Sequence, residues 1–212
     1  MRHFLSGILV VLAFIAAPAL TSANTVDKIR NDKVLAVEVA LAPGESETIP
    51  EQYPSMVVYM APGVVELTRA DGAKQRAAVK EGETVFQAAH AGSIVNAGAA
   101  RLDYVRVEFL TAGRDVTWGM TGLPPNYKML IENRFARAYD IRIPAHSFEQ
   151  LHTHHDRVVV SLQGATLEHL LPNGQIQPST LKTGEIVWRL GATHVGHNLG
   201  STDLWVIAIE PK

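Results

Sequence analysis

Short runs of alternating hydrophobic and polar residues, separated by turns, make up most of the chain after its first two dozen positions. Residues 138–143 alternate with a period of two, which is typical of a strand buried on one face. Residues 158–160 are three consecutive valines, which indicates a strand buried on both faces. A helical period is rare, so we predict an all-β protein. In the second half, strands are predicted over 135–143, 158–162, 166–170, 185–189 and 204–209.

The first 23 residues have a different pattern. Arg2 precedes an unbroken apolar run from Ile8 to Ala17, and small residues follow as far as Ala23. This order is typical of a secretory signal peptide, and the run is shorter than the roughly 20 apolar residues of a transmembrane helix. We therefore expect residues 1–23 to be cleaved and the protein to be periplasmic or secreted, not integral to a membrane. An uncleaved anchor is the alternative.

The rest of the chain contains an internal repeat. With a shift of 101 residues, Gly63 falls on Gly164, and with a shift of 102, after one inserted residue, Asn96 falls on Asn198. A repeat of short strands and turns predicts two copies of one small antiparallel barrel or jelly roll.

The repeat also gives the expected domain boundaries. The first barrel is predicted over 24–112 and the second over 132–212, with a linker over 113–131 that is rich in glycine and proline.

Composition narrows the chemistry. The chain has no cysteine, which excludes disulfides, thiolate metal sites and a cysteine nucleophile. Its formal net charge is −2 and it has no basic block, so a nucleic-acid partner is not supported. It has nine histidines, of which seven lie between His146 and His197. This concentration needs a chemical explanation.

Histidine spacing predicts a metal site in the second half. His152 and His154 stand two residues apart, so on a strand both imidazoles face the same side. Two neutral imidazoles can share a divalent metal ion, and a barrel could bring His194 to the same place as a third ligand. The alternative is that these imidazoles hydrogen-bond one another or line a pocket without metal.

At these residues the sequence resembles the cupin superfamily. The first cupin motif runs from a glycine through His-x-His to a glutamate and a second glycine, and His152, His154 and Gly164 match it. His146 stands where the first glycine would be, and we expect a loop there. In the second motif the histidine is matched by His194. The resemblance is to a bicupin, and it implies two tandem jelly-roll β-barrels after a cleaved signal peptide. The second copy also resembles small single-domain metal-binding cupins.

The sequence departs from the family at its glutamate ligand. Arg157 occupies that position, and a guanidinium has no lone pair to offer a metal. A three-histidine site with open positions resembles the iron centres of thiol dioxygenases, which implies that Arg157 could hold a substrate carboxylate. Alternatively, Arg157 turns outward and pairs with an acid such as Asp156. His197 and His169 are expected behind the ligands, and they are the only candidates for an acid–base residue.

The first copy is expected to lack this chemistry. Through the repeat, the three histidine positions fall on Glu51, Tyr53 and Gly92, and the position of Arg157 falls on Met56. One carboxylate and one phenol do not make a transition-metal site. The first barrel is therefore predicted to be a degenerate scaffold or dimerisation partner, and a metal-free ligand pocket is the alternative.

The functional hypothesis is an exported metal-binding bicupin. It would hold one divalent transition metal, Fe, Mn or Zn, and act as a dioxygenase-like enzyme on a small anionic substrate. The alternative is a non-catalytic periplasmic protein that binds metal or a small molecule. The expected partner is a small-molecule ligand, and the expected assembly is a monomer or homodimer.

Overall fold

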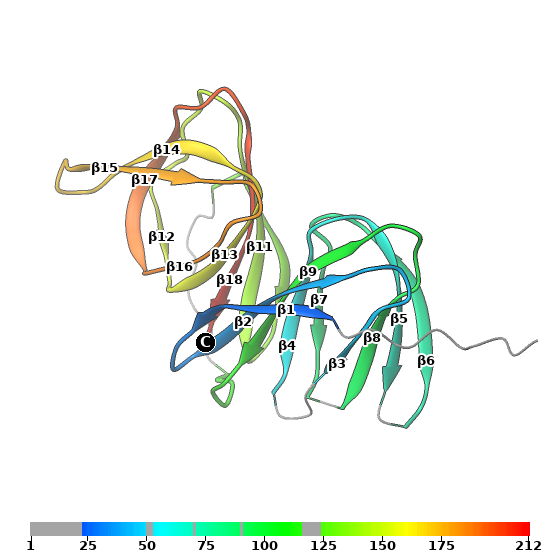
Figure 1. Cartoon of the computed structure of the whole chain (residues 1–212). Helices are drawn as coiled ribbons and strands as arrows, with labels where there is room; N and C mark the ends of the chain where they lie inside the picture. The colour runs from blue at the N-terminus through cyan, green and yellow to red at the C-terminus, as the bar shows by residue number, and fades with distance from the viewer. Residues whose placement is uncertain (1–22, 50–52, 70, 90, 116–123) are drawn as a thin grey trace, which may run out of the picture.

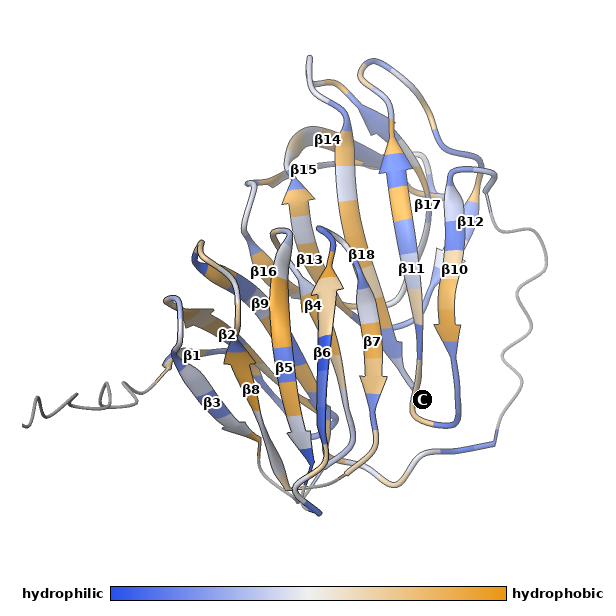
Figure 2. Ribbon diagram, turned by 90° about the vertical axis from the view of Figure 1, so that its right-hand side faces the viewer, coloured by the Kyte–Doolittle hydropathy of each residue, from blue (hydrophilic) through white to orange (hydrophobic). Residues whose placement is uncertain are grey.

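The computed structural model describes residues 23–49, 53–69, 71–89, 91–115 and 124–212. The predicted signal peptide therefore lies almost wholly outside the described residues. No helix within the described ranges is long and apolar enough to cross a membrane. The described residues form strands joined by turns, as the period of two predicted, and β11 alternates between hydrophobic and hydrophilic residues along its length (Figure 2).

Within the described residues the strands fall into two sets of nine. The first set is β1 (Asn24–Arg30), β2 (Val34–Leu41), β3 (Ser46–Ile49), β4 (Ser55–Tyr59), β5 (Gly63–Arg69), β6 (Lys74–Val79), β7 (Thr84–Gln87), β8 (Gly92–Asn96) and β9 (Leu102–Phe109). The second set is β10 (Tyr127–Glu132), β11 (Ala136–Ile143), β12 (His152–His154), β13 (Arg157–Gln163), β14 (Ala165–Leu170), β15 (Ile176–Leu181), β16 (Ile186–Arg189), β17 (Ala192–Asn198) and β18 (Leu204–Pro211).

The two halves have one topology. The first half has sheets of order β1-β2-β9-β4-β7 and β3-β8-β5-β6, and the second has β10-β11-β18-β13-β16 and β12-β17-β14-β15. Each order in the second half is that of the first with every strand number raised by nine. All of these pairs are antiparallel, and the two sheets of each half form one jelly-roll barrel (Figure 1). The predicted pair of all-β barrels is confirmed.

Strand register corrects the predicted alignment of the two copies. Val65 pairs with Asn96 and Leu167 with Asn198, a shift of 102 residues for both partners. The same shift holds earlier in the chain, where Gly44 and His146 both have positive φ, 81° and 57°. The first copy thus has a glycine at this left-handed turn position, and His146 adopts the same conformation in the second. The predicted shift of 101 residues up to Gly63, followed by one inserted residue, is therefore wrong: the shift is already 102 at Gly44 and His146.

Register also corrects the predicted start of the second domain. β10 begins at Tyr127 and pairs with β11 as β1 pairs with β2, so residues 127–131 are strand and not linker. A β-bulge between Met129 and Ile131 explains why this strand was missed, because it interrupts the alternation from which a strand is recognised. The equivalent bulge lies between Asp27 and Ile29 in β1.

The five-stranded sheets of the two barrels share one hydrophobic core. Val158 and Val160 pack in a buried cluster with Val105 and Val107 of the first barrel, while Val159 belongs to the interior core of the second barrel. This arrangement is why β13 is apolar on both faces, as the three consecutive valines predicted. The barrels are joined by apolar burial, the main favourable term in folding.

Candidate metal centre

The predicted histidines meet inside the second barrel. β12 and β17 are paired, with His152 opposite His194 and His154 opposite Ala192. Along β12 the two histidines are buried and Thr153 between them is exposed, so both imidazoles face the interior. One ligand atom from each of the three histidines lies within 4.8 Å of the other two. Two paired strands are sufficient to gather the three side chains.

The hydrogen bond of His152 orients its ring for coordination. Nδ1 of His152 lies 2.7 Å from the carbonyl oxygen of Gln150, and a carbonyl oxygen only accepts. Nδ1 therefore carries the proton, and the Nε2 lone pair points into the cluster. The Nε2 atoms of His152 and His154 are 2.9 Å apart. Nδ1 of His154 faces a carboxylate oxygen of Glu210 at 3.6 Å, behind the ligand face.

Burial keeps the imidazoles of His154 and His194 neutral, the form that binds a metal. Burial, together with the nearby positive charge of Arg157, lowers the pKa of His154 to about 2. Burial also lowers the pKa of His194 to about 2, with His169 the next contributor. The donor set, its lone-pair directions and its protonation all suit a divalent transition metal.

Acid is expected to destabilise the metal-free protein through these histidines. Histidine in the unfolded chain has a pKa near 6.5, whereas His154 and His194 in the folded chain stay unprotonated well below that pH. Below pH 6.5 the unfolded chain therefore binds more protons than the folded chain, which favours unfolding. Stability should fall by about 2 to 4 kcal/mol from pH 7 to pH 5, measured by urea unfolding of the metal-free protein. In the double variant His154→Gln, His194→Gln, the free energy of unfolding should depend less on pH. An equal loss in both proteins would contradict this assignment.

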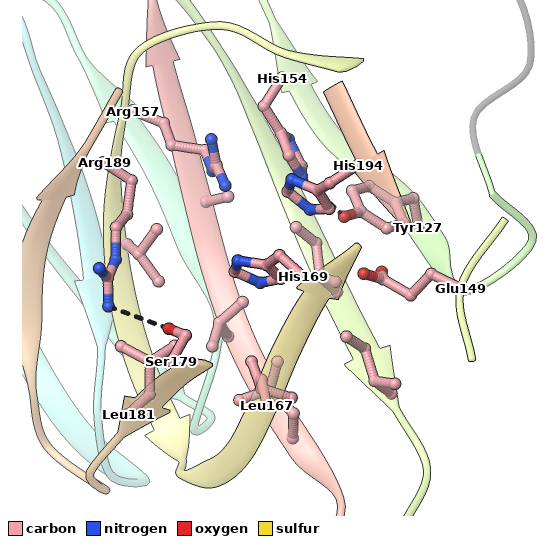
Figure 3. A pocket seen from close by; sticks show the side chains of 16 residues that line it. Tyr127, Glu149, His154, Arg157, Leu167, His169, Ser179, Leu181, Arg189 and His194 are labelled. Carbon is pink, nitrogen blue, oxygen red and sulfur yellow. Dashed lines mark hydrogen bonds between the residues drawn. The ribbon is translucent and has the colours of Figure 1, made fainter. Parts of the chain in front are cut away.

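Arg157 lies in the wall of a small cavity beside the histidines. The cavity has a volume of about 60 Å³ and its lining also includes His154, His194 and Arg189. Figure 3 shows these side chains directed toward one space. Only 8% of Arg157 is exposed, and its Nη1 lies 3.3 Å from the carbonyl oxygen of His155. The cavity therefore combines imidazoles with one buried and one half-buried guanidinium group.

The outward alternative for Arg157 is wrong. Asp156, its expected partner in that arrangement, accepts hydrogen bonds from Lys33 Nζ at 2.9 Å and from the backbone N–H of Gly191 at 2.8 Å. Val159 belongs to the interior core of the second barrel and Arg157 stands two residues before it on the same strand, so the side chain of Arg157 also points into the barrel.

The structure separates the two histidines that were expected behind the ligands. His169 lines the cavity and its ring stacks on that of His194, with centroids 4.3 Å apart. His197 does not reach the cluster, which corrects its predicted role. It is three residues after His194 on a strand, so it faces outward, where it contacts Glu168 at 2.9 Å and stacks on Phe148.

Two residues at the cluster were missed by sequence reasoning. The Tyr127 hydroxyl lies 3.0 Å from Nε2 of both His152 and His154. Glu149 is buried, with one carboxylate oxygen 3.9 Å from Nε2 of His152 and the other accepting a hydrogen bond from Asn126. With the correct shift of 102, Glu149 matches Glu47, so the repeat could have revealed this carboxylate.

The matching positions of the first barrel differ from those predicted. Ser46 pairs with Val95 as Phe148 pairs with His197, a shift of 102, but Ile49 pairs with Gly92 as His152 pairs with His194, so the second copy has one extra residue before β12. Ile49 and not Glu51 therefore has the register of His152. Glu51 itself lies outside the described residues, and Tyr53 precedes β4. Ser55, not Met56, corresponds to Arg157, because Ser55 pairs with Gln87 as Arg157 pairs with Arg189. The described counterparts, Ile49 and Gly92, are not metal ligands.

No protein-family model and no curated protein sequence matches this chain. Solved structures do resemble it. A cupin 2 conserved barrel domain protein from Leptotrichia buccalis has a TM-score of 0.61 at 12% identity, with 93% of each chain covered. AerE from Microcystis aeruginosa has a TM-score of 0.62 at 13% identity, covering 86% of this chain and 88% of that one. A variant of oxalate decarboxylase from Bacillus subtilis has a TM-score of 0.60 at 11% identity, covering 84% and 69%.

These likenesses define the class of the fold. At identities of 11 to 13% they establish architecture and not activity. The chain has the cupin fold, as its two histidine motifs predicted. Its likeness extends across both barrels, because more than four fifths of the chain is covered in each of the three comparisons.

Proposed function

We propose that this protein is a metal-binding cupin with one site, held by His152, His154 and His194 of the second barrel. The observation that carries the proposal is the convergence of three buried imidazoles whose ligand atoms lie within 4.8 Å of one another. Burying several imidazoles without a partner is costly, and a divalent metal ion offsets that cost. Fe, Mn and Zn all accept such a donor set.

We further propose that the site is that of a dioxygenase-like enzyme acting on a small anionic substrate. Bound metal would supply Lewis-acid or redox chemistry. Arg157 and Arg189 would bind a carboxylate, and the cavity of about 60 Å³ favours a molecule of few heavy atoms. The Tyr127 hydroxyl would hold a proton next to the ligands, since burial keeps its pKa well above the usual value. The oxalate decarboxylase of Bacillus subtilis has Mn(II) centres, which supports Mn as one candidate.

A non-catalytic binding protein is the second candidate. It is favoured by Arg157 at the position of the family glutamate, and by Ile49 and Gly92 at the matching positions of the first barrel. Metal analysis of the purified protein, with oxygen uptake over a panel of small thiols and carboxylates, separates the two. One metal per chain with turnover supports the enzyme, one metal without turnover supports non-catalytic metal binding, and no metal contradicts the enzyme and any metal-binding role.

The proposed setting is outside the cytoplasm. The pattern of residues 1–23 supports export with cleavage after Ala23, and a monomer or homodimer is the proposed assembly. The intact mass of the protein from a periplasmic fraction tests the cleavage. A mass that includes the first 23 residues would contradict it.

Replacing Arg157 with leucine is expected to weaken anion binding while metal stays bound. A bidentate, charge-assisted pair contributes about 1.5 to 3 kcal/mol, so oxalate used as a probe should bind about 10 to 100 times more weakly. Calorimetric titration of the metal-loaded protein measures this effect. The matched control is Arg142→Leu, because Arg142 is exposed and pairs with Asp140 outside the cavity. Equal losses in the two variants would contradict the role of Arg157.

A further inference from the structure

The first barrel contains a second, larger cavity. Its volume is about 670 Å³, within the range of roughly 300 to 1,000 Å³ that is usual for small-molecule sites. Its walls include side chains of β5, β6 and β7, namely Val65, Leu67, Ala77, Val79 and Gln87. None of these residues is used by the metal centre.

Strand register shows that this cavity is the counterpart of the cavity beside the histidines. Val65 pairs with Ala77 as Leu167 pairs with Ser179, and Gly63 pairs with Val79 as Ala165 pairs with Leu181. The five wall residues thus correspond, in order, to Leu167, His169, Ser179, Leu181 and Arg189, all of which line the cavity of the second barrel. The duplication kept the pocket in both barrels.

The chemistry of the wall has changed between the copies. Leu67 stands in place of His169, and Ala77 stands in place of Ser179. Gln87 stands in place of Arg189, so a neutral amide replaces a guanidinium. In the second barrel Arg189 and Ser179 lie 3.5 Å apart across the cavity wall, whereas alanine cannot make this contact. The first cavity is therefore wider and has no cation at the position of Arg189.

Gln87 provides a polar group inside this apolar cavity. Its side chain is 92% buried, and its Oε1 has no hydrogen-bond partner among the described residues. A buried acceptor without a partner is destabilising, and a ligand donor that bonds to it would recover that free energy. The Tyr59 ring also lines the cavity, and burial raises the pKa of its hydroxyl to about 12, so this hydroxyl is uncharged at neutral pH. The charged residues of the lining are Arg69 and Asp71, which are exposed, and Glu83, which is half-buried.

We propose that the first barrel is a binding site for a small uncharged molecule with an apolar body and one hydrogen-bond donor. The apolar body contacts Val65, Leu67, Ala77 and Val79, and the donor reaches Oε1 of Gln87. The site needs no metal and is independent of the function proposed for the second barrel. It gives the first barrel a role other than that of scaffold.

The test uses N-phenylnaphthylamine, an uncharged fluorescent probe with one N–H donor, and the full metal-loaded protein. We expect saturable binding of one probe per chain. Ala77→Phe should fill the cavity and lower the affinity at least tenfold, since a new side chain displaces ligand volume. The matched control is Ala78→Phe, because Ala78 is the exposed neighbour on the same strand and faces the other side. Retained metal shows that each variant is folded.

A second variant tests the hydrogen bond. Gln87→Leu should weaken N-phenylnaphthylamine about fivefold but should not weaken phenylnaphthalene, which lacks the N–H. This comparison decides the matter even if Ala77→Phe loses its metal. The proposal is overturned by absence of saturable binding to the unaltered protein, or by equal effects of the two phenylalanine variants. Equal losses for both probes in Gln87→Leu, or loss of binding in His152→Ala, would also overturn it.

Discussion

Replacing His152 with alanine is expected to remove the metal from the protein. The variant should retain less than about a tenth of the metal bound by the unaltered chain, because losing one of three imidazoles leaves too few donors for a tetrahedral site. Metal content after desalting, measured by elemental analysis, gives the result. An X-ray absorption spectrum of the unaltered protein should show nitrogen ligands at about 2.0 to 2.1 Å if zinc is bound.

The matched control for this experiment is His197→Ala. His197 lies on the same strand as His194 but faces outward against Glu168 and Phe148. The same chemical change should therefore leave the metal content unaltered. Equal metal loss in both variants, or full metal content in His152→Ala, would show that the site is elsewhere. Circular dichroism of each variant separates loss of a ligand from loss of the fold.

The histidine cluster could be predicted because it depends on strand geometry that a sequence displays. The period of two placed His152 and His154 on one face, and a closed barrel allowed His194 to lie beside them. Tyr127 reaches the cluster from β10, and Glu149 reaches it from the segment before β12. These two contacts depend on how segments distant in the sequence pack together. The spacing of residues along the chain carries no information about that packing.

The repeat was predicted correctly, but its register was not. Gly63 and Gly164 were matched because both are glycine, although they occupy neighbouring positions of the repeat. They are small for different reasons. A side chain at Gly164 would meet the backbone carbonyl of Leu181, whereas one at Gly63 would meet the side chain of Leu102. Residue type at a turn is thus weaker evidence for register than the pairing of strands.

Substituting an interface residue of the first barrel is expected to disrupt the metal site of the second. Val107 is fully buried in the core that both five-stranded sheets share, so Val107→Asp places an unpaired carboxylate between the barrels. Burying a charge without a partner costs several kcal/mol, enough to lower the melting temperature by more than about 10 °C. Metal release and loss of circular dichroism are followed together during heating. In the variant the midpoint temperatures of both transitions should fall by the same amount.

A matched variant separates this effect from that of a new charge alone. Val26 lies on β1 of the first barrel and is 46% exposed, so Val26→Asp should leave both transitions in place. In the unaltered protein the two signals should share one midpoint, because one apolar core joins the barrels. If Val107→Asp unfolds the first barrel while the second keeps its metal to the original temperature, the barrels are independent. Parallel loss would mean that the barrel without the three histidines supplies half of the core on which the metal site depends.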